Sequence, residues 1–308
     1  MLFKKLLLTA ALCSGALWTP VSYAEISQEE LQALIQYATK QNDAEAQAVL
    51  GNIYHTEKDY AKAKVWFEKA AAQNYTLALI ALGELYKNGH GVPQDYAKAK
   101  EWYEKAATQN DALAQTNLGN LYLYADGEGA LQDYGKAKKW YEKAATQNYA
   151  EAQFNLGLLY AKGLGISQDY TQAKEWFEKA AVQNLAKAQN NLGLLYMDGR
   201  GVRKDYTQAK VWFEKAAAQN DTGAQNNLGL LYMDGRGVRK DYAQAKVWFE
   251  KAAAQNDTGA QNNLGLLYMK GWGVRQNYAQ AKEWFGKACN NGDQDGCDIY
   301  RELHQKGY

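Results

Sequence analysis

The side chains that could carry chemistry in this chain of 308 residues are few and widely spaced. It has only three histidines and three cysteines, which argues against a metal centre or a histidine-based catalytic centre. The histidines, His55, His90 and His304, fall in separate segments without clustered carboxylates or thiols. Beyond residue 24 the serines are Ser27 and Ser167, and neither begins the S-x-x-K motif of serine acylases. The sequence therefore predicts no enzyme, no metal site and no cofactor.

Two cysteines have a spacing that indicates a covalent link. Seven residues separate Cys289 from Cys297. In an oxidising compartment, thiols at this spacing can join adjacent helices across a short turn, and we expect a structural disulfide. A redox-active pair is the alternative, but the C-x-x-C spacing and an activating context are lacking. Closing so small a loop stabilises a fold by about 2.5 kcal/mol on the chain-entropy estimate.

These residues are carried by seven copies of one unit. The copies align on tryptophans at spacings of 36, 38, 36, 36, 36 and 36, namely Trp66, Trp102, Trp140, Trp176, Trp212, Trp248 and Trp284. A fixed period of this length is typical of a solenoid. A copy reads A-x-x-x-L-G-x-L/I-Y, then a Gly-rich link, then D-Y-x-x-A-x-x-W-F/Y-E-K-A-A-x-Q-N. The first copy lacks the Gly-rich link.

Both halves of a copy are predicted to be helices, because apolar residues recur at the three-and-four spacing of an amphipathic helix. An Asp or Asn that can cap the second helix precedes it at Asp59, Asp95, Asp133, Asp169, Asp205, Asp241 and Asn277. Asn or Gly, which tolerate a left-handed helix end, follow it at Asn74, Asn110, Asn148, Asn184, Asn220, Asn256 and Gly292. The glycine inside each first helix predicts a neighbouring helix pressed against the backbone, rather than a phosphate site.

These motifs resemble the SEL-one-like repeat family, a relative of the tetratricopeptide repeats. L-G-x-L-Y, G-x-G-V, D-Y-x-x-A and W-[FY]-x-K-A-A cover roughly residues 44–307. The resemblance implies an all-α fold, an α/α solenoid in which antiparallel helix pairs form a right-handed superhelix that binds other macromolecules. We expect a capping helix at 25–42, seven repeats at 43–292 and a second capping helix at 293–308. A polar cap at each open end keeps such a stack soluble.

Residues 1–24 have the pattern of a secretory signal peptide. A basic start at Lys4 and Lys5 leads into an apolar run too short to span a bilayer, and Ser22 and Ala24 suit cleavage. A retained membrane anchor is the alternative. We expect a periplasmic or secreted protein without stable membrane insertion. The net charge of +1 gives no sign of a nucleic-acid partner.

A stack places equivalent residues in rows, so a polar residue recurring without a core function is a candidate ligand contact. One row precedes the Leu-Gly pair, on the helix that lines the concave surface in related solenoids: Asn117, Asn155, Asn191, Asn227 and Asn263. Amides can pair with the backbone of an extended peptide. Alternatively they bond to neighbouring loops or to each other. The same alternatives apply to the row Gln153, Gln189, Gln225 and Gln261.

Two further rows lie in the C-terminal half. The variable place of L-G-x-L-Y holds Leu158, Leu194, Leu230 and Leu266, followed by Met197, Met233 and Met269. These residues form either an apolar groove or tighter packing. The last three links carry Arg200, Arg203, Lys204, Arg236, Arg239, Lys240 and Arg275, which meet an acidic partner or cell-envelope polymer, or are only solvated.

The function predicted from these features is that of an exported scaffold binding a protein or peptide of unknown identity on its concave face. The resemblance leaves an alternative open, because a cysteine-rich branch of the family is associated with penicillin binding or β-lactam hydrolysis. That alternative lacks the S-D-N and K-T-G motifs here. A secreted host-interaction factor using the same groove is the third possibility.

Overall fold

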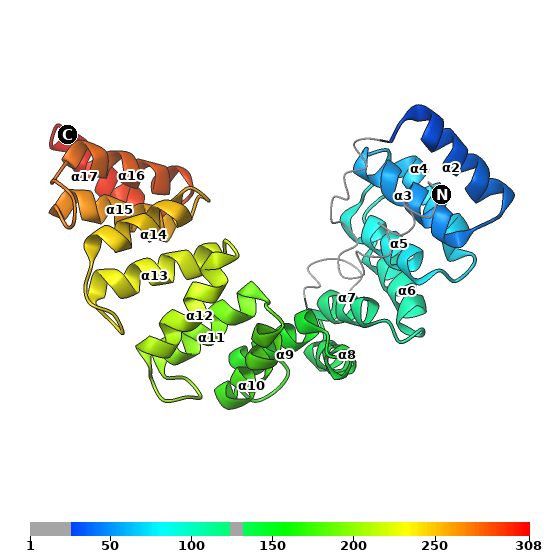
Figure 1. The fold of residues 1–308 in the computed structure, drawn as a ribbon, viewed down its shortest axis with the longest axis horizontal. Helices are drawn as coiled ribbons and strands as arrows, with labels where there is room; N and C mark the ends of the chain where they lie inside the picture. Colours follow the sequence, from blue (N-terminus) through cyan, green and yellow to red (C-terminus); the bar gives the residue numbers. More distant parts are fainter. Residues whose placement is uncertain (1–25, 124–131) are drawn as a thin grey trace. The chain divides into compact units, whose positions relative to one another are not determined.

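A computed structural model of the chain describes residues 26–123 and 132–308, and every regular element within them is an α-helix (Figure 1). The signal peptide predicted for residues 1–24 lies outside the described residues. The chain divides into two compact units, called unit 1 up to Ala152 and unit 2 from Gln153 onward.

Helices follow one another through both units. Unit 1 contains α2 (Gln28–Lys40), α3 (Ala44–Thr56), α4 (Tyr60–Ala71), α5 (Thr76–Asn88), α6 (Tyr96–Ala107), α7 (Ala112–Leu123) and α8 (Tyr134–Thr146). The helix α9 (Ala150–Lys162) begins just before the boundary. Unit 2 continues with α10 (Tyr170–Val182), α11 (Ala186–Asp198), α12 (Tyr206–Ala218), α13 (Thr222–Asp234), α14 (Tyr242–Ala253), α15 (Thr258–Lys270), α16 (Tyr278–Asn290) and α17 (Gln294–Gln305).

Helices pack in pairs, as the repeat predicts. In unit 1, α3 packs on α4, α5 on α6 and α7 on α8. In unit 2 the pairs are α11 with α12, α13 with α14 and α15 with α16. Within each unit, pairs also pack on the next one along the chain, for example α4 on α5 and α12 on α13. The predicted all-α repeat solenoid is confirmed.

The boundaries of the second helices follow from the residues that flank them. Asp205 is the N-cap of α12, and its Oδ1 accepts hydrogen bonds from the backbone N–H groups of Thr207 and Gln208 at 2.9 and 3.0 Å. The cap residue accepts a first-turn bond in every copy. After α12 the chain turns at Asn220, whose φ of 67° is left-handed. Both predicted signals are therefore confirmed.

The glycine of each first helix makes room for an aromatic ring. A Cβ built on Gly229 would lie 2.4 Å from the ring of Phe249 on the paired helix α14. The equivalent distance is 2.4–2.8 Å in all seven copies. Any other residue would push the two helices apart. The predicted close approach is confirmed, and it comes from the second helix of the same copy.

The Gly-x-Gly links fasten each copy to the one before it. A Cβ on the second glycine, Gly237, would lie 2.5 Å from the backbone carbon of Tyr206 in the preceding copy. The side chain between the two glycines then covers the ring of that tyrosine. Trp272 stacks on Tyr242 with ring centroids 5.3 Å apart, and Arg236 lies over Tyr206 at 5.7 Å.

The two ends of the chain are closed differently. Ser27 and Glu30 form a capping box at the start of α2, which packs on α3. At the other end, Cys289 of α16 and Cys297 of α17 form the predicted disulfide, with their Cα atoms 4.4 Å apart. Arg301, which replaces the glycine of a first helix, is exposed on α17.

Candidate functional site

The asparagine row lies on the first helices, and in unit 2 its members reach across to the preceding repeat. Nδ2 of Asn227 donates a hydrogen bond to Oδ1 of Asn190 at 3.0 Å, and Asn263 donates to Asn226 at 3.2 Å. The accepting asparagine stands immediately before the row residue of its own repeat. The side chains of Asn227 and Asn263 are half-buried, and their own Oδ1 atoms accept no hydrogen bond within the described chain.

The remaining members of the row have different partners. Asn191 donates to the backbone oxygen of Lys187 one turn earlier at 2.8 Å. In unit 1, Asn117 makes a long contact of 3.4 Å with Glu84. Asn155 is 8% exposed and has a partner of its own. The five asparagines thus share a position in the repeat but not a hydrogen-bonding pattern. Only Asn227 and Asn263 make the same bond, each to an asparagine of the preceding repeat.

The glutamine row is part of the framework. Gln225 is 2% exposed, and its Nε2 donates to Oδ1 of Asn220, the residue that ends the preceding helix. Its Oε1 accepts from Nε2 of Gln255, which follows the second helix of the same copy, at 2.9 Å. Gln189 bonds in the same way to Asn184 and Gln219. Buried amides with both ends satisfied lock the turns between helices. The structural alternative is therefore the correct one for this row.

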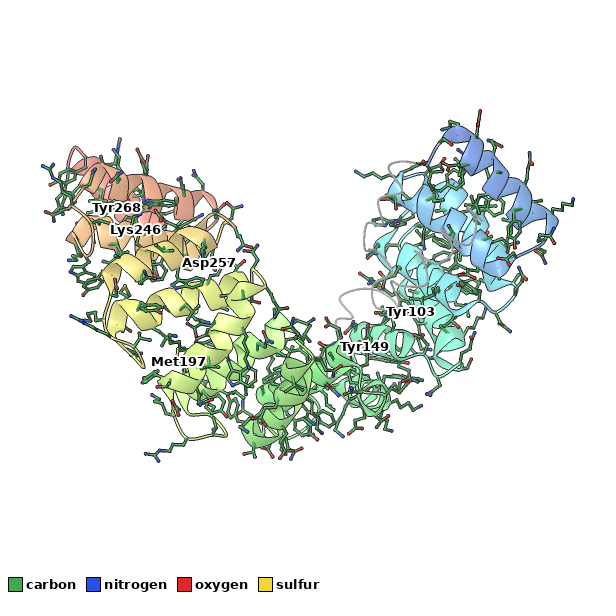
Figure 2. All side chains as sticks on the ribbon, viewed as in Figure 1. Tyr103, Tyr149, Met197, Lys246, Asp257 and Tyr268 are labelled. Carbon is green, nitrogen blue, oxygen red and sulfur yellow. A yellow bond between two sulfur atoms is a disulfide. The ribbon has the colours of Figure 1, made fainter. Side chains whose placement is uncertain are left out.

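The leucine and methionine rows of unit 2 contribute to packing between repeats. Leu194 and Met197 pack against a buried cluster that joins Phe213 of their own repeat to Leu228 of the next one. Leu230 and Met233 occupy the same place one repeat later. All four remain partly exposed, so they line a surface as well as support it. Figure 2 shows Met197 and Tyr268 among the side chains of unit 2.

Unit 1 has polar residues where unit 2 has these leucines. Glu84 of α5 is 9% exposed, and it accepts a hydrogen bond of 2.6 Å from the hydroxyl of Tyr103 on α6 (Figure 2). Lys87 lies 2.7 Å from the other carboxylate oxygen. In the next copy, the hydroxyl of Tyr141 donates to Oδ1 of Asn120 at 2.7 Å. Burial, followed by the nearby Glu84, raises the pKa of Tyr103 well above its usual range.

This pairing of polar residues was visible in the sequence but was missed. The two copies with W-Y in place of W-F carry Glu84 and Asn120 at the variable place of L-G-x-L-Y. The copies with W-F carry leucine there, except the first, which has Asn52. A phenolic hydroxyl buried against this position needs a polar partner. The covariation between repeats was the available signal.

Two histidines lie together, contrary to the expectation that they stand apart. His55 and His90 belong to different copies, but their ring centroids are 5.8 Å apart, because the link of the second copy folds back on the first. His90 also stacks on Tyr60 at 4.6 Å. Burial, then the charge on His90, lowers the pKa of His55 to about 4. His55 is therefore neutral at neutral pH, and its contacts with His90 and Tyr60 are aromatic packing.

Within the described residues no three side chains of the His, Cys, Asp and Glu types come together as a metal site would require. Ser27 caps α2, and Ser167 is exposed in the link before α10. Among the described residues no helix is long and apolar enough to cross a membrane. The surface features that recur across repeats are amides, partly exposed apolar side chains and basic link residues.

Comparisons with known proteins agree with this description. The Sel1 repeat family matches residues 76–111, 112–149, 150–184, 186–221, 222–257 and 258–293, and a tetratricopeptide repeat matches residues 44–75. No curated protein matches the chain.

Two solved structures share both sequence and fold with the chain. A protective antigen present in uropathogenic Escherichia coli strains, which displays an SLR fold, is 37% identical with a TM-score of 0.77. That match covers 90% of this chain and 60% of the antigen, so the chain spans less than two thirds of that relative. A Sel1 repeat protein from Oxalobacter formigenes is 35% identical over 78% of this chain and 98% of its own, with a TM-score of 0.73.

Proposed function

The chain belongs to the Sel1 repeat family, and we propose that it is an exported scaffold whose unit 2 binds an extended segment of a partner protein along its first helices. At the level of the family, such a repeat scaffold is suited to mediate protein–protein interactions. The observation that carries the finer proposal is that Asn227 and Asn263 each donate to an asparagine of the preceding repeat, while their own Oδ1 atoms accept no hydrogen bond from the described residues.

The position of these amides favours a ligand surface. The first helices α13 and α15 of successive repeats contact each other. We propose that the first helices line the concave face of unit 2, as the family resemblance implies. Partly exposed Leu230 stands beside the amides on α13. Amide acceptors beside apolar side chains suit an extended peptide, whose backbone N–H groups need acceptors.

Export is supported by the pattern of residues 1–24 and by the disulfide between Cys289 and Cys297. Disulfides persist in oxidising compartments such as the periplasm or the extracellular medium. We therefore place the protein in the periplasm or outside the cell. Fractionation of the native cells distinguishes the two locations.

The test combines site-specific cross-linking with substitution of the amides. A photo-cross-linker replacing Leu230 should capture the partner in the native envelope, and mass spectrometry should identify it. A matched cross-linker replacing Val247, which is 43% exposed on α14, should capture none of it. Replacing Asn191, Asn227 and Asn263 together by alanine should abolish capture while the helical content stays unchanged. Capture that persists in this variant would show that the row is structural.

A further inference from the structure

Basic side chains recur along the links of unit 2, on a surface separate from the asparagine row. We call these residues the link edge: Arg203, Lys204, Arg239, Lys240 and Arg275. All five are exposed. They precede the second helices α12, α14 and α16 at the same place in three consecutive repeats.

The arginines of these links differ in what they contact. Arg200 and Arg236, between the two glycines, are already used: they pair with Asp198 at 3.4 Å and with Asp234 at 3.1 Å. They also cover tyrosines of the preceding repeats. Arg203, Arg239 and Arg275 make no ion pair within the described chain, and each extends from an exposed link. Three guanidinium groups therefore stand available in a row.

The fold does not need these arginines. The link before α10 has Ser167 and Gln168 in the places of Arg203 and Lys204. Its backbone is nevertheless the same, with φ of 69° and 66° at its two glycines against 73° and 63° at Gly199 and Gly201. Serine and arginine thus serve the link equally, so the basic row calls for a reason outside the fold.

A cleft opens beside the row. Arg239 and Lys240 line an open space of about 660 Å³, together with Tyr232, Val238, Asp241, Tyr242, Ala243 and Gly273 of the following link. The lining combines two cations and aromatic and aliphatic surface with the carboxylate of Asp241, whose Oδ1 is engaged in capping α14. Such a cleft suits a peptide side chain with an acidic group better than a free ion, because apolar walls add contact area to the charge pairing.

We infer that the link edge binds an acidic protein segment in an extended polyproline II conformation, with one carboxylate on the arginine of each repeat. The equivalent helices α13 and α15 of successive repeats contact each other, and packed helices lie roughly 8–10 Å apart, so we take the arginines to recur at about that spacing. A polyproline II segment rises about 3.1 Å per residue with three residues per turn, so every third side chain returns to one face after about 9 Å. A carboxylate also fits the planar fork of arginine in two parallel hydrogen bonds.

Nucleic acid fits the same edge poorly. Duplex DNA carries a negative charge about every 1.7 Å of its axis, far denser than one free arginine per repeat. The net charge of the whole chain is only +1, which gives no long-range attraction for such a polyanion.

The test is a titration of the purified chain with a fluorescent peptide of repeated Glu-Pro-Pro triplets at low salt. The Arg203→Ser, Arg239→Ser, Arg275→Ser variant takes the residue that the link before α10 already has, so it should fold normally. We expect it to bind about tenfold more weakly, since three exposed charge pairs each contribute a fraction of a kcal/mol. The control variant Lys62→Gln, Lys98→Gln, Lys136→Gln removes the same charge from unit 1 and should bind within about twofold of the parent.

Two further probes make the result decisive. A peptide of the same composition with its glutamates contiguous should bind more weakly, because only one or two of them reach an arginine. The alanine variant of the asparagine row should bind the triplet peptide normally, which separates this surface from the proposed concave one. The inference is overturned by absent binding at low salt, by equal binding of the contiguous peptide or of inorganic polyphosphate, or by an equal loss in the lysine control.

Discussion

Units 1 and 2 join their repeats with different chemistry at the same positions. In the first two copies of unit 1, the residues before the Leu-Gly pair are Ala48-Val49 and Ile80-Ala81, all buried in one hydrophobic cluster that runs from α2 to α7. In the last three copies of unit 2, the same positions are Asn-Asn pairs, of which Asn227 and Asn263 donate to the preceding repeat, and the buried cores form separate clusters. The same backbone arrangement thus accommodates either an apolar or an amide-bridged junction between repeats.

The comparison indicates that the two units are specialised. An apolar junction gives more stability, because burying hydrocarbon is favourable and no polar group needs a partner. An amide-bridged junction gives less stability and leaves amide oxygens that can accept hydrogen bonds at the surface. Unit 1 therefore has the composition of a support, and unit 2 that of a contact surface.

The largest expected effect comes from placing the amide of unit 2 in unit 1. Ile80→Asn loses a fully buried side chain, and the equivalent of its bridging residue, Asn117, already donates to Glu84. We expect unit 1 to be destabilised by about 4 kcal/mol, measured by urea unfolding and by hydrogen exchange in α5 and α6. The reciprocal change, Asn190→Ile with Asn227→Ala, replaces both partners and should alter stability by less than about 1 kcal/mol. Equal losses in both variants would show that the junctions are equivalent.

A smaller effect is expected at the buried tyrosine of unit 1. Tyr103→Phe removes the donor that faces Glu84 and should cost about 1–3 kcal/mol. Adding Glu84→Leu recreates the Leu-Phe combination of unit 2, and we expect it to recover most of that loss. A double-mutant cycle on thermal unfolding measures the coupling. If the effects of Tyr103→Phe and Glu84→Leu on stability simply add, the two residues do not act as a coupled pair.

The smallest effect concerns the helix caps in acid. Asp59, Asp95 and Asp133 of unit 1 face Lys62, Lys98 and Lys136, whereas unit 2 has glutamine at those lysine positions. Hydrogen bonds from the lysines, through the side chain first for Asp59 and through the backbone N–H first for the other two, lower the pKa of these carboxyls. The stability they confer is full above the unfolded pKa of about 3.9 and is lost as the pH falls through the folded value.

The lysine-to-glutamine variant used above tests this assignment. It should lose less stability than the parent between neutral pH and about pH 2, because the side-chain part of the interaction is already gone. Hydrogen exchange in the first turns of α4, α6 and α8 reports the change, with α12 and α14 as internal references. An acid response identical to that of the parent would assign the lowered pKa values to the backbone bonds alone.

Much of the fold was predictable because each repeated residue answers a local requirement. Asp205 caps a helix, Asn220 ends one and Gly229 admits a ring, and each of these interactions lies within one or two turns of the chain or within one helix pair. The asparagine row was predicted to share a helix position, which it does. Its partners were beyond prediction, because they depend on the register between repeats: Asn227 reaches Asn190 of the preceding repeat, whereas Asn191 bonds to the backbone of Lys187 in its own helix. The meeting of His55 with His90 was missed for the same reason.

The stacking of a link residue on the tyrosine of the preceding copy makes this contact between copies the same along the array. In four of the described links, the residue between the two glycines covers a tyrosine of the preceding copy, as Trp272 does for Tyr242, and Tyr308 lies on Tyr278 in the same manner. Whole copies can therefore be duplicated or deleted without leaving a tyrosine uncovered at the junction between repeats. Residues 188–223 and 224–259, which differ only at Thr207 and Ala243, have the sequence that such copying leaves behind. Evolution can in this way change the length of the protein one whole repeat at a time.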